Sequence, residues 1–361
     1  MRRPSPLIYV LLGVTALWCV GEARLKKDGY RLENPNEAWQ YRSYDPVLGW
    51  DTPPGQTLSS EAKPDSPIVE TVWADGCRAS RPDRFAKAPK RVLVVGCSYT
   101  YGLGVADSDT WVWKIGARYP QVNFDNAACY AYGAYQSMLR AQRFLESGRH
   151  YDAVIYAAMH DHPRRDGAIG HILGSTAQTQ YYVLNPRIIW DGGRLKEYGP
   201  WAHWPGDELS RCLNFAKRVY YFNETLHPLH VDEAAKADVY RAFFAVIKRL
   251  EACARAHGSR FILGVLEDRE KWEGEMNAIE PHPHYPIVYM GELPQSPAYH
   301  LHGDVHKHPN AIMHAQWANN LAQQLPQACP ELMQAEPSEH MQAEPSEPMQ
   351  AEPSEPMQAE P

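Results

Sequence analysis

Apolar runs of strand length, separated by amphipathic helical stretches, are the feature that most constrains the fold of this chain. Each run is short and continuously apolar, as in a parallel strand that is buried on both faces. The runs lie at residues 91–95, 122–124, 152–159, 260–266 and 286–289. The helical stretches lie at residues 110–118, 136–147, 234–257 and 309–325. Because strands that alternate with helices form βαβ units, we predict an α/β fold, a three-layer α/β/α sandwich around a central, mostly parallel five-stranded sheet.

The N-terminus has the composition of an export signal. Arg2 and Arg3 precede an apolar run at residues 7–20, and Gly21-Glu22-Ala23 provides small residues where a signal peptidase needs them. The run is shorter than the roughly 20 apolar residues of a membrane span. We therefore predict that residues 1–23 are a signal peptide, with an uncleaved N-terminal membrane anchor as the alternative. In both cases the domain is exported, to the periplasm or as a secreted protein.

The C-terminus is a low-complexity repeat. A Met-Gln-Ala-Glu-Pro-Ser-Glu unit starts at Met333 and begins again at Met341, Met349 and Met357. Such a segment has too little apolar surface to offset the entropy lost on ordering. We predict a disordered tail over residues 333–361, which is either a solvated spacer or a docking tail for an unidentified partner. One domain remains, over residues 30–330.

Composition limits the partners and leaves the cysteines open. The formal net charge of −7 argues against a nucleic-acid partner, because phosphate binding needs a basic face. The 11 Trp and 21 Tyr side chains can fill a core or stack on sugar rings. Without Cys19, six cysteines remain, so an exported protein could hold disulfides whose connectivity the sequence does not give. Their spacing does not match a metal-binding knuckle.

Ser98 follows the first predicted strand in a turn rich in glycine, Gly96-Cys97-Ser98-Tyr99-Thr100-Tyr101-Gly102. Glycine permits a tight strand-to-helix turn and close approach of a substrate. A serine here could be a nucleophile beside free backbone N–H groups, and it could equally be the cap of the next helix. A nucleotide-binding loop is incomplete, because Gly102-Leu103-Gly104 lacks the further residues of the known motifs.

Four segments, in order, resemble the sequence blocks of the SGNH (GDSL-type) hydrolase and esterase superfamily. They are residues 91–111 (RVLVVGCSYTYGLGVADSDTW), 126–133, 156–162 and 303–310, and residues 45–50 (DPVLGW) resemble a lead-in of exported, bacterial-type members. The resemblance covers roughly residues 45–325. It implies the flavodoxin-like sandwich of SGNH hydrolases, which agrees with the fold expected from the strand pattern.

The resemblance also implies roles for individual residues. Ser98 would be the nucleophile, His308 the general base and Asp304 the carboxylate that orients the imidazole. The oxyanion hole would consist of the backbone N–H groups of Ser98 and Ala131 together with the side chain of His160. His306, Asp161 and His162 are secondary candidates.

This sequence departs from the family pattern at four positions. Cys97 replaces the aspartate of the GDS motif. Because Cys97 and Cys129 both lie at the ends of predicted neighbouring strands, we consider a disulfide between them. Ala131 stands where the family has the oxyanion glycine, and His160 stands where it has asparagine. Asp304 lies four residues before His308, where the family has two or three, so the loop contains an insertion or His308 lacks its usual partner.

The histidines suggest one further alternative. His300, His302, His306 and His308 lie near Asp304, and such a group could bind a transition metal. We prefer a polar loop with one catalytic histidine, and therefore predict no metal and no cofactor. Residues 163–233 lack strong periodicity, and we interpret them as an insertion over the active-site crevice that sets specificity. Within it, Asp191-Gly192-Gly193 is typical of a hairpin turn.

The predicted function is that of an exported serine esterase. It would hydrolyse an acyl ester, with acetyl preferred, on a small molecule or a glycan through an acyl-serine intermediate. One alternative is an O-acyltransferase that acts on a cell-envelope glycan. Another is a catalytically inactive SGNH-like protein for binding or assembly in the envelope.

Overall fold

The computed structural model describes residues 6–28, 43–60, 68–83, 88–167, 171–173, 181–183, 186–199, 206, 209–216, 233–276, 279, 283–304 and 307–334. The predicted repeat tail at residues 333–361 lies almost wholly outside these ranges.

A five-stranded sheet forms the centre of the domain. Its strands are β5 (Lys90–Gly96), β6 (Val122–Asn126), β7 (Ala153–Ala158), β12 (Arg260–Val265) and β13 (Ile287–Tyr289), in the spatial order β13-β12-β7-β5-β6. Every neighbouring pair in this sheet is parallel. The predicted α/β fold is therefore confirmed, and each strand lies within a few residues of its predicted position.

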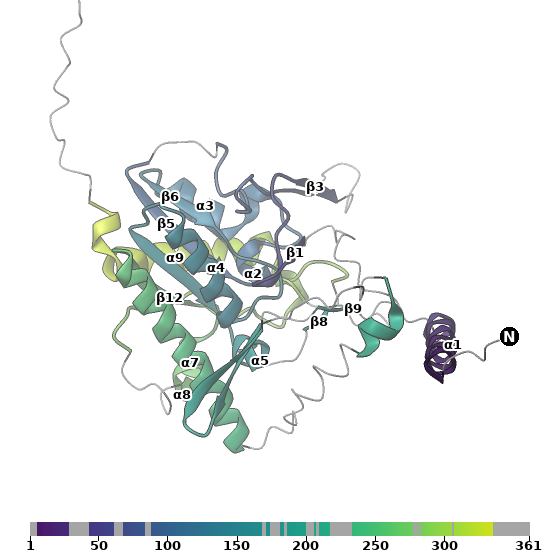
Figure 1. The fold of residues 1–361 in the computed structure, drawn as a ribbon. Coiled ribbons are helices and arrows are strands. Elements are labelled where there is room, and N and C mark those ends of the chain that lie inside the picture. Colours follow the sequence, from purple (N-terminus) through teal and green to yellow (C-terminus); the bar gives the residue numbers. More distant parts are fainter. Residues whose placement is uncertain are drawn as a thin grey trace, which may run out of the picture.

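Two helical layers cover the sheet (Figure 1). The helices α4 (Ala134–Glu146) and α7 (Glu233–Ala256) bury one face in a core that includes Tyr156, Phe243 and Leu263. The helices α3 (Trp111–Arg118) and α9 (Ala311–Ala328) bury the other face in a core around Trp111 and Trp317. In a parallel sheet the carboxyl ends of all strands lie at the same edge, so the loops after β5, β6, β7 and β12 meet at one edge of the sheet.

The other elements are short, apart from α1. They are α1 (Pro6–Lys27), β1 (Ser43–Asp45), β2 (Gly49–Asp51), β3 (Thr57–Ser60), β4 (Ile68–Thr71), α2 (Ser98–Tyr101), η1 (Asp107–Asp109), α5 (His162–Gly167), β8 (His171–Leu173), β9 (Tyr181–Val183), β10 (Arg187–Asp191), β11 (Arg194–Tyr198), α8 (Arg269–Met276), η2 (Pro297–Tyr299) and η3 (Pro330–Leu332). The small strands form four antiparallel hairpins, β1-β2, β3-β4, β8-β9 and β10-β11.

The hairpin β10-β11 is the best-described part of the predicted insertion. Asp191 pairs with Arg194 across the two-residue loop Gly192-Gly193, whose φ values of 56° and 85° require glycine-like freedom. Ile188 of β10 is buried in the same core as α4 and α7. Much of residues 163–233 lies outside the described ranges, so its place over the crevice stays a prediction.

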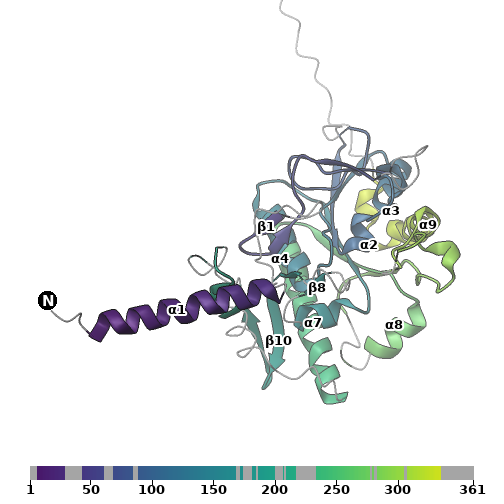
Figure 2. The ribbon, with the colours of Figure 1, turned by 90° about the vertical axis from the view of Figure 1, so that its right-hand side faces the viewer.

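Helix α1 projects away from the sandwich (Figure 2). Near its end, the carboxylate of Glu22 accepts hydrogen bonds from the backbone N–H groups of Arg211 and Cys212, at 3.1 and 2.9 Å. Within the described ranges, no helix has both the length and the apolar character needed to cross a membrane. Whether residues 1–23 are removed stays a prediction.

The disulfide considered between Cys97 and Cys129 is wrong for this structure, because neither buried cysteine is part of a disulfide. Although the two residues follow neighbouring strands, the Cys97 sulfur faces Met159, whose sulfur lies 3.5 Å away. Proximity of the backbones does not align the two sulfur atoms, which a disulfide requires.

Candidate active site

Ser98 is the first residue of α2, directly after β5. A Cβ atom on Gly96 would lie 2.5 Å from the Thr100 hydroxyl and 3.1 Å from the carbonyl oxygen of Ala157, so the turn needs glycine. Only 4% of Ser98 is exposed. The short helix therefore places the hydroxyl, nearly buried, at the carboxyl edge of the sheet.

His308 lies in the loop before α9 and faces Ser98. Its Nε2 atom lies 3.1 Å from the Ser98 Oγ, although 210 residues separate the two in the chain. Asn310 fixes this loop, because its side chain accepts hydrogen bonds from the N–H groups of Ile312 and Met313 at the start of α9. The sequence prediction that these two side chains meet agrees with this geometry.

Asp304 contacts the opposite side of the His308 ring. Its Oδ2 atom lies 2.6 Å from the ring Nδ1 and accepts a second hydrogen bond, at 2.7 Å, from the His308 backbone N–H. With a proton on Nδ1, Nε2 has a lone pair for the serine hydroxyl. The extra residue before His308 is accommodated in a turn in which Lys307 has a positive φ of 54°. His306 lies outside the described residues.

Two tyrosine rings flank the imidazole of His308. The Tyr99 ring contacts it edge-on with a centroid distance of 5.6 Å, and the Tyr130 ring stacks on it at 6.2 Å. Burial raises the pKa of Tyr99 to about 12, so its phenol is neutral at physiological pH. The rings limit the rotation of His308 and the access of water to it.

Two backbone N–H groups near Ser98 fit an oxyanion hole. Among the described residues, no acceptor binds the N–H of Ser98 or that of Ala131. Ala131 has φ of 61°, which L-residues other than glycine seldom adopt. It lies in the loop of residues 129–132 after β6, which we call the oxyanion loop. An unpaired N–H is costly in a buried loop unless a ligand uses it.

His160, the third predicted oxyanion donor, is paired with Glu267. Glu267 follows β12, and one oxygen of its carboxylate contacts both the backbone N–H of His160, at 2.7 Å, and the ring Nδ1. The hydrogen bond that the ring donates to Glu267 raises the pKa of His160, against the smaller effects of burial and Lys271. The raised pKa extends to higher pH the range in which the ring is an imidazolium, the form in which Nε2 can donate a hydrogen bond.

The secondary candidates Asp161 and His162 have structural partners. Asp161 binds Arg164 and Arg165 at 2.6 and 2.8 Å, and although burial opposes it, these guanidinium groups lower the pKa of the carboxyl. His162 is fully buried with its Nδ1 atom 2.6 Å from the Tyr156 hydroxyl, and burial lowers its pKa far below the usual value. A neutral, buried ring of this kind cannot reach a substrate.

The described residues contain no group of three or more side chains that could hold a metal ion. His300, one of the residues considered for such a site, has its two ring nitrogens 2.9 and 2.7 Å from the carbonyl oxygens of Lys307 and Pro294.

Two contributors to the site escaped the sequence analysis. Glu267 is one of them, and the signal for it was its position directly after a predicted strand, at the sheet edge that holds Ser98. Trp50 is the other: its indole N–H donates to the carbonyl oxygen of Tyr130 at 2.8 Å. The lead-in motif contains this residue, but nothing in the motif indicates a contact with the oxyanion loop.

No protein-family model matches the chain, and no curated protein matches it. Solved structures that resemble it include proteins described as lipolytic members of the G-D-S-L family. A psychrotrophic esterase from Pseudoalteromonas sp. has 9% identity and a TM-score of 0.37, with 66% of this chain and 97% of that chain covered. A lipolytic protein of the G-D-S-L family from Veillonella parvula has 12% identity and a TM-score of 0.36, with 65% and 97% covered. An acetyl xylan esterase from Butyrivibrio proteoclasticus has 9% identity and a TM-score of 0.34, with 67% and 64% covered.

Proposed function

We propose that this chain is an exported serine esterase that cleaves an acyl ester, with acetyl preferred, through an acyl-Ser98 intermediate. The observation that supports it is the continuous hydrogen-bonded series from Ser98 through His308 to Asp304. A serine hydroxyl is a weak nucleophile until a base removes its proton, and this geometry supplies both the base and its orienting carboxylate.

The reaction would proceed in two halves. As the Ser98 oxygen attacks the ester carbonyl, His308 Nε2 takes the hydroxyl proton, and Asp304 stabilises the imidazolium that forms. The N–H groups of Ser98 and Ala131 would bind the oxyanion, together with the side chain of His160. The protonated His308 then gives its proton to the leaving alcohol. Water, activated by the same imidazole, would release the acid and regenerate Ser98.

The direct test is hydrolysis of p-nitrophenyl acetate by the purified protein and by its Ser98→Ala variant. We expect turnover by the first and a loss of at least about a thousandfold in the second. A fluorophosphonate probe should label Ser98, as peptide mass mapping can show. A folded protein that neither hydrolyses short esters nor reacts with the probe would contradict the proposal and favour an inactive binding protein.

Acyl transfer is the second candidate, and the burial of the site favours it. Only 4% of Ser98 and 7% of His308 is exposed, so bulk water has restricted access to an acyl-serine. With a radiolabelled acetyl donor and a series of sugar acceptors, label on the sugar would indicate a transferase. Label found only in free acetate would indicate a hydrolase.

The glycan substrate and the export of the protein belong to the same proposal. The supply of tyrosine rings near His308 suits stacking on a sugar ring. Export is supported by the basic and then apolar start of the chain. Fractionation of cells that produce the full chain, with N-terminal sequencing of the mature protein, would test export and cleavage together.

A further inference from the structure

The hairpin β1-β2 packs directly on the oxyanion loop. Leu48 and Trp50 of the hairpin are buried in one cluster with Cys129, Ala131 and Tyr132. This cluster joins the lead-in of the chain to a loop that lies 80 residues later in the sequence. The hairpin is therefore a part of the wall behind the oxyanion loop.

The indole of Trp50 binds one particular peptide unit of that loop. Its Nε1–H donates to the carbonyl oxygen of Tyr130 at 2.8 Å, and this carbonyl shares its peptide plane with the N–H of Ala131. In a planar trans peptide the C=O and N–H bonds point in opposite directions. A donor that holds the carbonyl in place therefore also fixes the direction of the Ala131 N–H.

The 130–131 peptide needs a contact from outside the loop to keep its orientation, because the flipped orientation gives Ala131 a backbone conformation of lower energy. Rotation of the 130–131 peptide by half a turn would take φ of Ala131 from 61° to a negative value, which L-residues prefer. The same rotation would turn the N–H of Ala131 away from its present direction. The hydrogen bond from Trp50 opposes this rotation.

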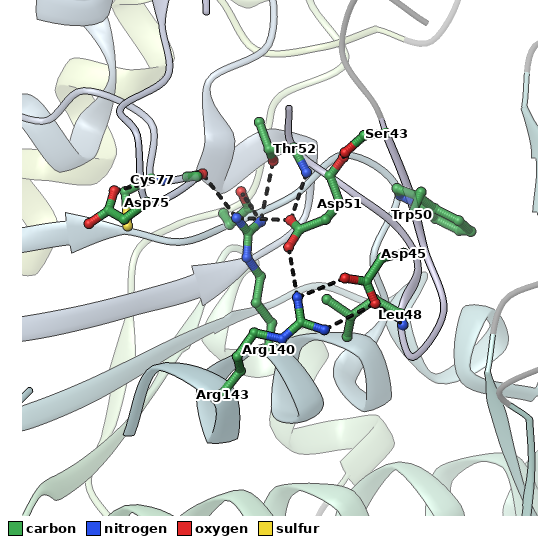
Figure 3. Close-up of polar contacts among 12 residues, drawn as sticks. Ser43, Asp45, Leu48, Trp50, Asp51, Thr52, Asp75, Cys77, Arg140 and Arg143 are labelled. Carbon is green, nitrogen blue, oxygen red and sulfur yellow. Dashed lines mark hydrogen bonds and ion pairs between the residues drawn. The ribbon is translucent and has the colours of Figure 1, made fainter. Parts of the chain in front are cut away.

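Further contacts keep Trp50 itself in place. The Tyr132 hydroxyl donates to the Trp50 carbonyl oxygen at 2.6 Å, so the hairpin and the loop are bonded in both directions. Behind the hairpin, Arg140 of α4 binds Asp51 at 2.9 Å and Arg143 binds Asp45 at 2.8 Å (Figure 3). These ion pairs fix both strands of the hairpin to the helix that follows the oxyanion loop.

We infer that Trp50 is a positioning residue for the oxyanion hole, which it acts on by holding the 130–131 peptide with its indole N–H. The inference rests on the proposed esterase function. Trp50 lies outside the four motif blocks, yet it would affect catalysis. The effect would depend on the hydrogen bond from its indole N–H and not on the size of its side chain.

The test compares Trp50→Phe with the wild type on p-nitrophenyl acetate. We expect kcat to fall about 10- to 100-fold, which does not exceed the fall in kcat that follows the removal of one oxyanion donor. KM should change less than about threefold. In the Trp50→Phe background, adding Ala131→Gly should raise kcat at least about fivefold above that of Trp50→Phe alone, since glycine accepts a positive φ without strain. A purely structural role for Trp50 would give no such rescue.

Trp317→Phe is the matched control. Trp317 is also buried, and its indole N–H also donates to a backbone carbonyl at 2.8 Å, that of Gly291. Its ring stacks on Tyr99 with a centroid distance of 6.0 Å, a contact that the phenylalanine ring can keep. We expect a comparable loss of thermal stability and a kcat within about twofold of wild type. If Trp50→Phe does not fold, replacement of Trp50 by 3-benzothienylalanine keeps the bicyclic ring and removes only the N–H donor.

The outcomes separate this inference from the proposed function. Equal kcat in wild type and Trp50→Phe, or no rescue by Ala131→Gly, would overturn the inference while Ser98 stays the nucleophile. If the wild type turns over no ester, the proposed function fails, and a crystal structure of Trp50→Phe still decides the inference. A Tyr130 carbonyl that keeps its direction in that structure would refute it.

Discussion

Asp304 holds His308 through one carboxylate oxygen that accepts two hydrogen bonds, from the backbone N–H at 2.7 Å and from the ring Nδ1 at 2.6 Å. One contact fixes the loop, and the other fixes the tautomer in which Nε2 faces Ser98. The four-residue spacing between the two residues therefore still produces a complete Ser-His-Asp arrangement. The first prediction follows from this double contact.

Asp304→Asn should lower kcat on p-nitrophenyl acetate about 10²- to 10⁴-fold, with a smaller change in KM. The amide can still accept the backbone hydrogen bond, but it lacks the charge that stabilises the imidazolium, and its NH₂ group favours the wrong tautomer. Asp109→Asn is the control, because Asp109 is half-exposed and pairs only with Lys114 among its described neighbours. Near-normal kcat in Asp304→Asn would mean that another group orients His308.

The pairing of His160 with Glu267 predicts a falling alkaline limb in the pH profile of kcat/KM. Glu267 raises the pKa of His160, whereas Lys271 on α8 lowers it and Asp161 raises it. If the imidazolium stabilises the oxyanion, activity is highest below that pKa and is lost as the pH rises through it.

His160→Asn should remove the falling limb, because an amide donates a hydrogen bond at every pH. Activity at the optimum should stay within about tenfold of wild type. Glu267→Gln, which keeps the size of the side chain and removes its charge, should shift the falling limb to lower pH. An unchanged alkaline limb in His160→Asn would show that His160 is not an oxyanion donor.

The strands, and the position of Ser98 in a turn at the sheet edge, could be predicted because each depends on local sequence, whereas the role of Ser98 as a nucleophile rests on the family resemblance. A parallel strand that is buried on both faces is apolar at every position, so runs such as residues 91–95 stand out. Ser98 stands out because a tight turn after such a strand needs glycine at Gly96. The approach of His308 to Ser98 could be expected only through the family resemblance, since 210 residues separate them.

The remaining features depend on side-chain directions that a sequence does not specify. Cys97 and Cys129 follow neighbouring strands, yet the Cys97 sulfur faces Met159, so the expected disulfide is wrong. The pairing of His160 with Glu267 joins the ends of two strands that are neighbours in the sheet, and strand order is not readable from one sequence. The contact of Trp50 with Tyr130 needs the hairpin to fold back over the sheet edge.

Asp166 predicts a decrease in the free energy of unfolding between about pH 4 and pH 8. The side chain is 2% exposed, and burial raises its pKa to about 8, although the N–H groups of Tyr135 and Ala134 bind the carboxylate. In this range the unfolded chain has lost the Asp166 proton and the folded chain keeps it, so rising pH favours unfolding. Above about pH 8 both states are ionised and the effect levels off.

Asp166→Asn should flatten this decrease, because the amide does not titrate and its oxygen can still accept from the Tyr135 N–H. The free energy of unfolding of both proteins is measured by urea denaturation at pH 5 and at pH 8. We expect the difference in this free energy between wild type and variant to change by at least about 1 kcal/mol from one pH to the other. Asp238→Asn, an exposed site paired with Arg241, controls for general charge effects. Parallel stability curves for wild type and Asp166→Asn would refute an elevated pKa.

The last prediction concerns the ion pairs of Arg140 and Arg143 with the β1-β2 hairpin, which we call the clamp behind the oxyanion loop. The guanidinium of Arg140 is 1% exposed and binds Asp51, the Thr52 hydroxyl and the carbonyl oxygens of Gly76 and Ala128, at 2.9 to 3.3 Å. Arg140→Met would remove the buried guanidinium and its hydrogen bonds to these acceptors, so we expect a loss of about 3–5 kcal/mol in the free energy of unfolding. Arg143→Met, at an exposed guanidinium that also binds Asp51, should cost less than about 1 kcal/mol. Equal losses in the two variants, measured by urea denaturation, would show that burial of Arg140 adds nothing to the clamp.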